Sequence, residues 1–104
     1  MADPTSKVPH LLGITLDGTG VANSIVVAVN LTSGGKQIKA TDSNKVVVFD
    51  AAEFTNGYST SDVIQFENCG ASLGGTTITI NSATGGFQEA TITCAAAPTG
   101  AVEL

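Results

Sequence analysis

The chain has 104 residues, which is enough for one domain with a hydrophobic core of its own. Only 12% of the residues are charged, and the formal net charge is -5 with four basic residues in all. So few basic residues exclude the basic stripe of a nucleic-acid-binding surface and the polybasic patch of a membrane-surface protein. No apolar stretch reaches the ~18 residues of a membrane span. We therefore expect no nucleic-acid partner and no membrane insertion.

Period-2 alternation of apolar and polar residues dominates the middle of the chain. Residues 1–10 contain two prolines and no periodicity, which predicts an extended N-terminal arm. Short segments rich in Val, Ile and Thr follow, separated by Gly, Asn, Asp and Ser, and such segments are typical of β-strands. They predict seven strands, over residues 11–16, 24–31, 36–41, 45–50, 62–68, 76–81 and 87–94. Ala51–Phe54 is predicted to form one helical turn with Asp50 as its N-cap, and residues 95–104 a C-terminal tail.

This spacing of strands, without a long helix or a domain break, predicts an all-β fold in which two antiparallel sheets form a sandwich over residues 11–94. A small closed barrel is the alternative. In residues 24–31 we place Ile25, Val27, Val29 and Leu31 inward, with Ser24, Ala28 and Asn30 on the opposite face. In residues 36–41 we place Ile38 and Ala40 inward and Lys39 outward. The predicted core consists of Leu12, Ile14, Ile25, Val27, Val29, Val47, Phe49, Ile64, Phe66, Ile78, Ile80 and Ile92.

Three segments resemble a known family of sandwich modules. Gly13–Asn30 is similar to the opening of carboxypeptidase-regulatory-like and CnaB-type domains, which have a strand, a Gly-containing turn and a long alternating strand. Thr41–Asn44 followed by Val46–Phe49 resembles their next hairpin. Asn56–Tyr58 with Ser61–Ile64 resembles a step of such modules in viral and archaeal surface proteins. The resemblance implies a seven-stranded immunoglobulin-like, prealbumin or CnaB-type, sandwich, whereas function does not follow from fold.

The sequence departs from that family pattern at two turns and at its cross-link. Lys45 and Ser61 stand where the pattern has glycine. The family often carries a Lys–Asn isopeptide bond between the first and last strands. Residues 11–16 contain no Lys and residues 87–94 contain no Asn, so we expect no such bond.

Cys69 and Cys94 are the chain's two cysteines. Each follows a strand that runs in the same direction, so both fall at one end of the sandwich, and we predict a disulfide between them. Closing this loop would stabilise the fold by about 3 kcal/mol. The alternative is a pair of buried free thiols that pack as small apolar residues.

The remaining reactive side chains favour structural roles. One histidine, one tyrosine and two cysteines do not supply a nucleophile, a base and an orienting group, or a zinc shell. We expect no enzymatic activity, no catalytic residue, no cofactor and no metal. His10 is predicted to lie at the surface or an interface, Tyr58 to pack at a corner of the sandwich, and the Asn30-Leu31-Thr32 sequon to be the end of a strand. Turn formation, rather than calcium binding, is expected of Asp17, Asp42 and Asn44.

A small sandwich with a surface poor in charge and two arms favours a structural protein. From residues 1–7 we expect no secretory signal, and viral structural proteins assemble without one. We expect a capsid decoration or cement-type protein on a virion surface, with copies of itself and a major capsid protein as partners. The apolar side chains that could anchor its arms are Val8, Leu11, Val102 and Leu104. The alternatives are a subunit of an extracellular filament or surface layer, and a carbohydrate- or receptor-binding adhesin module.

Overall fold

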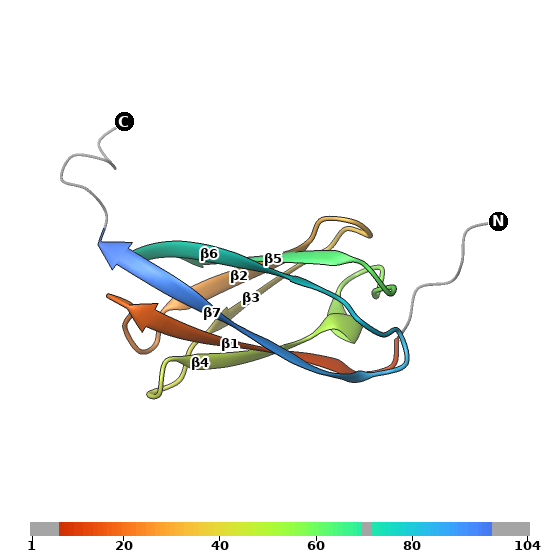
Figure 1. Cartoon of the computed structure of the whole chain (residues 1–104), viewed down its shortest axis with the longest axis horizontal. Helices are drawn as coiled ribbons and strands as arrows, with labels where there is room; N and C mark the ends of the chain where they lie inside the picture. Colours follow the sequence, from red (N-terminus) through yellow and green to blue (C-terminus); the bar gives the residue numbers. More distant parts are fainter. Residues whose placement is uncertain (1–6, 70–71, 97–104) are drawn as a thin grey trace.

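The computed structural model describes residues 7–69 and 72–96, which form seven β-strands and one 3-10 turn (Figure 1). Every predicted strand overlaps an observed one. The elements are β1 (His10–Gly18), β2 (Ile25–Asn30), β3 (Lys36–Ala40), β4 (Val46–Asp50), η1 (Ala51–Glu53), β5 (Val63–Cys69), β6 (Ser72–Thr79) and β7 (Gly86–Ala96). Within the described residues no helix has the length and hydropathy of a membrane span.

The strands form two layers that face each other across the core, so the predicted all-β sandwich is confirmed. The strand order is β3-β2-β5-β6-β7-β1-β4. One layer holds β3, β2, β5 and β6, and the other holds β7, β1 and β4 (Figure 1). The layers join where β6 pairs with β7 at two register positions, Ser72↔Ala96 and Leu73↔Ala95.

The prediction that all strands pair antiparallel is wrong at one place. β1 and β7 run parallel and pair from His10↔Gly86 to Gly18↔Cys94. The first and last strands of the sandwich therefore lie side by side. β1 takes in the last residue of the predicted N-terminal arm, and β7 takes in the first two residues of the predicted tail. Residues 7–9 of the predicted N-terminal arm are described, whereas residues 1–6 and 97–104, which include Val102 and Leu104, lie outside the described residues.

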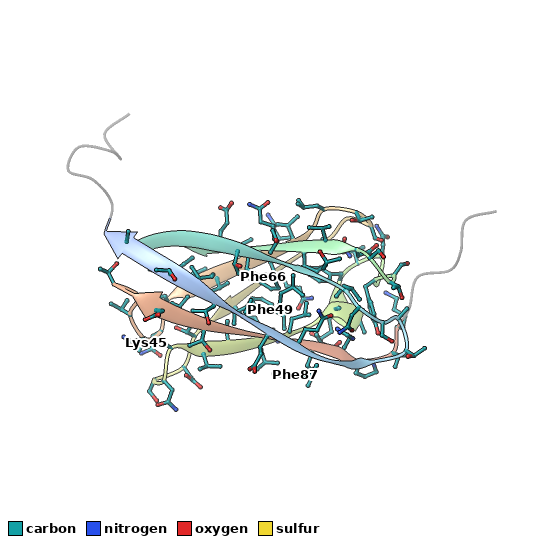
Figure 2. The ribbon with its side chains drawn as sticks, viewed as in Figure 1. Lys45, Phe49, Phe66 and Phe87 are labelled. Carbon is teal, nitrogen blue, oxygen red and sulfur yellow. The ribbon has the colours of Figure 1, made fainter. Side chains whose placement is uncertain are left out.

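The core lies between the two layers, and Phe49 and Phe66 meet at its centre (Figure 2). Their ring centroids are 5.6 Å apart and the rings are tilted by 48°. Such tilted pairs are favourable for aromatic rings. Nine of the predicted core residues are buried, namely Leu12, Ile14, Val47, Phe49, Ile64, Phe66, Ile78, Ile80 and Ile92.

The predicted orientation of β2 and β3 is wrong. Val26, Ala28 and Asn30 point into the core, so the predicted core residues Ile25, Val27 and Val29 lie on the outer face. The neighbouring β3 follows the same alternation. Gln37 is buried, whereas Ile38, which was predicted to face inward with Ala40, is 58% exposed.

The polar residues at the ends of β2 explain its orientation. Ser24 Oγ donates to the carbonyl of Val21 at 2.8 Å, and Ser24 N–H donates to Thr41 Oγ1 at 2.9 Å. At the other end Asn30 Nδ2 donates to the buried carboxylate of Asp62 at 3.0 Å. These bonds satisfy polar groups that burial would otherwise penalise. They leave the larger β-branched residues on the outside.

Three described residues other than glycine have left-handed backbone, and the first of them is Asn23, with a φ of 60°. Lys45 has a φ of 65° and Ser61 a φ of 77°. These are the two positions at which the sequence departs from glycine in the family pattern. L-residues adopt this conformation at a cost of about 1–2 kcal/mol. The helical turn after β4 is confirmed as η1, and the carboxylate of its N-cap Asp50 accepts the N–H of Ala52 at 2.9 Å.

Candidate functional site

An apolar stripe runs along the outer face of β2 and β3. Its members, which we call the β2–β3 stripe, are Ile25, Val27, Val29, Leu31 and Ile38. Ile25 is 42% exposed and Leu31 57%, while the two valines are half-buried. Val27 pairs with Ile38 across the two strands, so the stripe is continuous. Contiguous exposed apolar side chains on a small domain commonly mark a contact surface.

A shallow groove separates this stripe from the polar part of the same face. The groove has a volume of about 140 Å³ and is lined by Val27, Val29, Leu31, Gln65 and Glu67. Gln65 Nε2 donates to Glu67 Oε1 at 2.9 Å, which holds both side chains of β5 along one wall. The groove therefore has an aliphatic wall from β2 and an amide–carboxylate wall from β5.

The two end strands of the sandwich meet at an unpaired seam. β3 and β4 end the strand order and do not pair with each other, although the turn at residues 41–45 joins them (Figure 1). Gln37 Nε2 donates to the carbonyl of Asp50 at 2.8 Å, and Lys39 Nζ donates to the carbonyl of Val48 at 3.3 Å. The Lys39 ammonium also lies 5.9 Å from the ring centroid of Phe49. Gln37 Oε1 is buried at this seam and has no hydrogen-bond partner.

The outer face of the other layer carries a second, smaller apolar group. Phe87 of β7 is 54% exposed, and Figure 2 shows it away from the core rings. A Cβ placed on Gly13 would lie 3.0 Å from Phe87 Cζ, so the ring lies over this glycine. Leu11, a predicted arm anchor, is 40% exposed and pairs with Phe87 in register. Val48 on β4 is 42% exposed.

The chain just before β1 is bound to its own domain. Tyr58 Oη donates to the carbonyl of Val8 at 2.7 Å, and Lys7 Nζ lies 3.3 Å from the carbonyl of Thr55. The predicted corner role of Tyr58 is confirmed, because its side chain is fully buried and holds this segment. The side chain of Val8, another predicted anchor, is 47% exposed.

His10 is fully buried within its own domain, so its predicted position at the surface or an interface is wrong. Its ring lies 5.5 Å from the ring of Tyr58, measured between centroids. Its Nε2 is 2.8 Å from Gln88 Oε1. The Gln88 amide is oriented by its Nε2, which donates to the carbonyl of Thr79, so Oε1 is the acceptor and His10 Nε2 donates. The imidazole thus serves as a packed, hydrogen-bonded element of the core.

A buried polar cluster surrounds Asp62. Its carboxylate accepts hydrogen bonds from Asn30 Nδ2 at 3.0 Å, Ser33 Oγ at 2.6 Å and the N–H of Ser59 at 2.9 Å. Asn30 Oδ1 accepts the N–H groups of two residues in the following turn. The Asn30 residue is 1% exposed, and both ends of its side-chain amide are hydrogen-bonded, so it cannot be glycosylated in this fold. The sequon ends a strand, as predicted.

The predicted disulfide between Cys69 and Cys94 is not formed. Cys94 is a free, buried thiol on the same face of β7 as Ile92. The residue of β5 that reaches its Sγ is Asn68, whose Nδ2 lies 3.5 Å away. The alternative of a buried free thiol therefore holds for Cys94.

The turn carboxylates act within their own turns. Asp42 Oδ1 accepts the N–H groups of Asn44 and Val46, at 2.8 and 3.1 Å. Asp17 Oδ1 accepts the N–H of Gly18 at 2.7 Å. Across residues 7–69 and 72–96, no group of three or more His, Cys, Asp and Glu side chains could hold a metal ion.

A scan against protein-family models and a search of curated proteins both found no match for this chain. The site therefore stands on its own geometry. The apolar outer surface was missed by the sequence prediction. One signal in the sequence could have located it. The polar residues Ser24 and Asn30 lie on the same face of the strand as Ala28, so placing that face inward leaves the large apolar residues outside.

Proposed function

We propose that this chain is a non-enzymatic structural protein of a virion surface, a decoration or cement-type protein that contacts copies of itself and a larger protein shell. The β2–β3 stripe is the observation that carries the proposal. Five apolar side chains on and just after two adjacent strands form one continuous surface, which is larger than the apolar group of Leu11, Val48 and Phe87 on the other layer. Burying such a surface against another protein removes it from water, at about 25 cal/mol per Å² of apolar area.

The proposal includes an immunoglobulin-like fold of the prealbumin or CnaB type. Seven strands in two layers support it, as does the left-handed backbone at Lys45 and Ser61. An experimental structure in which β3 and β4 pair directly would contradict this assignment, because that pairing would close the sandwich into a barrel.

The decisive experiment starts from the gene's neighbourhood. If a major capsid gene lies beside it, shells assembled from that capsid protein are mixed with the purified chain and sedimented. We expect the chain to co-sediment at a fixed number of copies per capsid subunit. Failure to bind, or a neighbourhood of pilus or surface-layer genes, would contradict the virion assignment.

A matched pair of variants locates the contact. Ile38→Glu places a charge in the stripe and should lower occupancy at least tenfold, because a charge buried without a partner is costly. Val48→Glu places the same charge at an exposed apolar position of the opposite layer and should leave occupancy unchanged. The reverse result would assign the contact to the β4–β1–β7 face instead.

A subunit of an extracellular filament or surface layer is the second candidate. The free edge of β3 favours it, since filament subunits commonly add a strand to a neighbour's sheet. Electron microscopy of the purified chain at high concentration distinguishes the two candidates. Regular filaments without added shells would favour the second.

A further inference from the structure

The free edge of β3 presents an unpaired set of backbone groups. Among the described strands β3 pairs with β2 alone. Thr41 N–H donates to the carbonyl of Ser24, and Asn30 N–H donates to the carbonyl of Gly35. Bonded and non-bonded positions alternate along an antiparallel ladder. The N–H and C=O groups of Lys36, Ile38 and Ala40 therefore point away from β2, into the seam.

The seam is only partly closed from the β4 side. Gln37 and Lys39 reach across it with one hydrogen bond each, and the buried Gln37 Oε1 accepts none. Gln37 is 9% exposed, so this unpaired oxygen is held within the seam rather than in bulk water. An incoming strand would bring N–H donors to this region and would pair the free edge of β3.

The charges on this edge select an acidic strand. Two of the chain's four basic residues, Lys36 and Lys39, fall within the five residues of β3, and Lys45 follows in the next turn. β3 contains no acidic residue. Lysines on an edge strand discourage pairing with a neutral or basic strand, and they attract a strand that carries a carboxylate.

The sequence of the chain contains a segment of matching length and charge. Residues 100–104 read Gly-Ala-Val-Glu-Leu, five residues without proline, the same length as β3. Val102 and Leu104 alternate with Glu103, so a strand would place both apolar side chains on one face. On the outer face they would extend the β2–β3 stripe beyond Ile38, and Glu103 would share the inner face with Lys39.

The segment must come from a second copy. A strand added to the free edge of β3 would lie next to β4. Counted across β1 and β4, which is the shorter way round the sandwich, it would be three inter-strand spacings from β7, or about 14 Å. The four Cα steps from Ala96 to Gly100 reach at most about 14 Å when fully extended. That reach leaves no length for the turn from the direction of β7 into that of β3.

We propose that residues 100–104 of one copy add as a strand to the free edge of β3 in a second copy. This inference rests on the proposed function, because it supplies the contact between copies that a surface lattice needs. The contact is head-to-tail, so each copy gives one strand and receives one, which builds open chains or closed rings, the smallest being a reciprocal dimer.

The test uses two variants of the full chain that block opposite halves of this contact. Ile38→Pro removes an N–H that points into the seam and leaves the β2 ladder intact. Deletion of residues 100–104 removes the donated strand. Sedimentation velocity and light scattering should show concentration-dependent assembly of the wild type and monomers of each variant. An equimolar mixture of the two should form a 1:1 heterodimer and nothing larger, because only one edge and one strand remain.

Two controls separate backbone pairing from side-chain loss and misfolding. Ile38→Ala keeps the backbone N–H and removes only the side chain. It should weaken assembly by less than about tenfold, which is the change in affinity expected from losing one cross-strand side-chain pair. Circular dichroism should show the same cooperative melting for all variants. Charge reversal at Lys36 and Lys39 should abolish assembly, and adding Glu103→Lys should restore it.

Each remaining outcome has a definite meaning. If both blocking variants assemble as the wild type does, or if their mixture stays monomeric, strand addition at β3 is wrong. Co-sedimentation with capsid shells is measured on the same proteins. Shell binding that survives in both blocking variants would leave the proposed function standing without this contact. A wild type that is monomeric at every concentration and binds no shell would overturn both.

Discussion

β2 and β5 lie side by side in one layer but differ in what they expose. β5 buries Ile64 and Phe66 and turns Gln65 and Glu67 outward. β2 buries Val26 and Ala28 and exposes residues that are as apolar as those it buries. Hydrophobicity therefore orients β5 but cannot orient β2.

The polar residues at its ends orient β2. Asn30 occupies the inner face because Asp62, Thr32 and Ser33 use both ends of its amide. A slip of one residue would expose Val26 and Ala28 and bury the apolar residues now outside, at little apolar cost, but it would break these bonds. A strand that is apolar on both faces thus takes its orientation from a few buried hydrogen bonds, and it keeps one apolar face available for a partner.

Phe66→Ala has the largest expected effect, since it removes the central side chain of the inner face of β5. We expect the free energy of unfolding to fall by about 3–5 kcal/mol. Gln65→Ala, one residue along on the outer face, should change it by less than about 0.5 kcal/mol. Urea denaturation followed by circular dichroism measures both, and similar losses for the two would contradict the assigned faces.

Asn30→Ala tests the bonds that orient β2. It removes the two hydrogen bonds that Asn30 Oδ1 accepts and the one that Nδ2 donates to a carboxylate. We therefore expect the free energy of unfolding to fall by about 2–4 kcal/mol. Leu31→Ala, at a side chain that is 57% exposed, should cost less than about 1 kcal/mol. Equal effects would show that the Asp62 cluster does not hold the strand.

A pair of isosteric changes compares the two faces of β2 directly. Val26→Thr buries a hydroxyl in the core and should cost about 1–3 kcal/mol. Val27→Thr changes the half-buried outer face and should be neutral within about 0.5 kcal/mol. If Val27→Thr were the more damaging change in thermal or urea unfolding, β2 would face the way its hydrophobicity suggested.

The smallest expected effect is at the turn that sets the register of β4. Lys45→Gly relieves a left-handed backbone that costs an L-residue about 1–2 kcal/mol, partly offset by the extra freedom of glycine in the unfolded chain. A gain of up to about 1 kcal/mol should follow. Asn44→Gly, which changes an adjacent residue without positive φ, should lower stability by about 0.5 kcal/mol. A gain from both would show that strain is not the cause.

The sequence was sufficient for the strands whose two faces differ in polarity. Phe66, Ile78 and Ile80 were placed correctly because polar neighbours alternate with them. The burial of His10 depends on the Gln88 amide of another strand, and the free thiol of Cys94 lies beside the Asn68 amide. Neither partner is close in sequence, so no local pattern could indicate it. The parallel pairing of β1 with β7 is hidden for the same reason.

The parallel pairing of β1 with β7 also determines how the domain resists a pulling force applied to its two ends. β1 starts at the end of the ladder where His10 pairs with Gly86, and β7 leaves at the opposite end, beyond Cys94. Pulling the chain from both sides therefore slides the two strands past each other and stresses the whole ladder at once, instead of opening it bond by bond. In force spectroscopy, extension through residues 7 and 96 should need a higher rupture force than extension through residues 63 and 79, which unzips the β5–β6 hairpin. The sandwich would then act as a mechanical clamp between whatever its two ends hold.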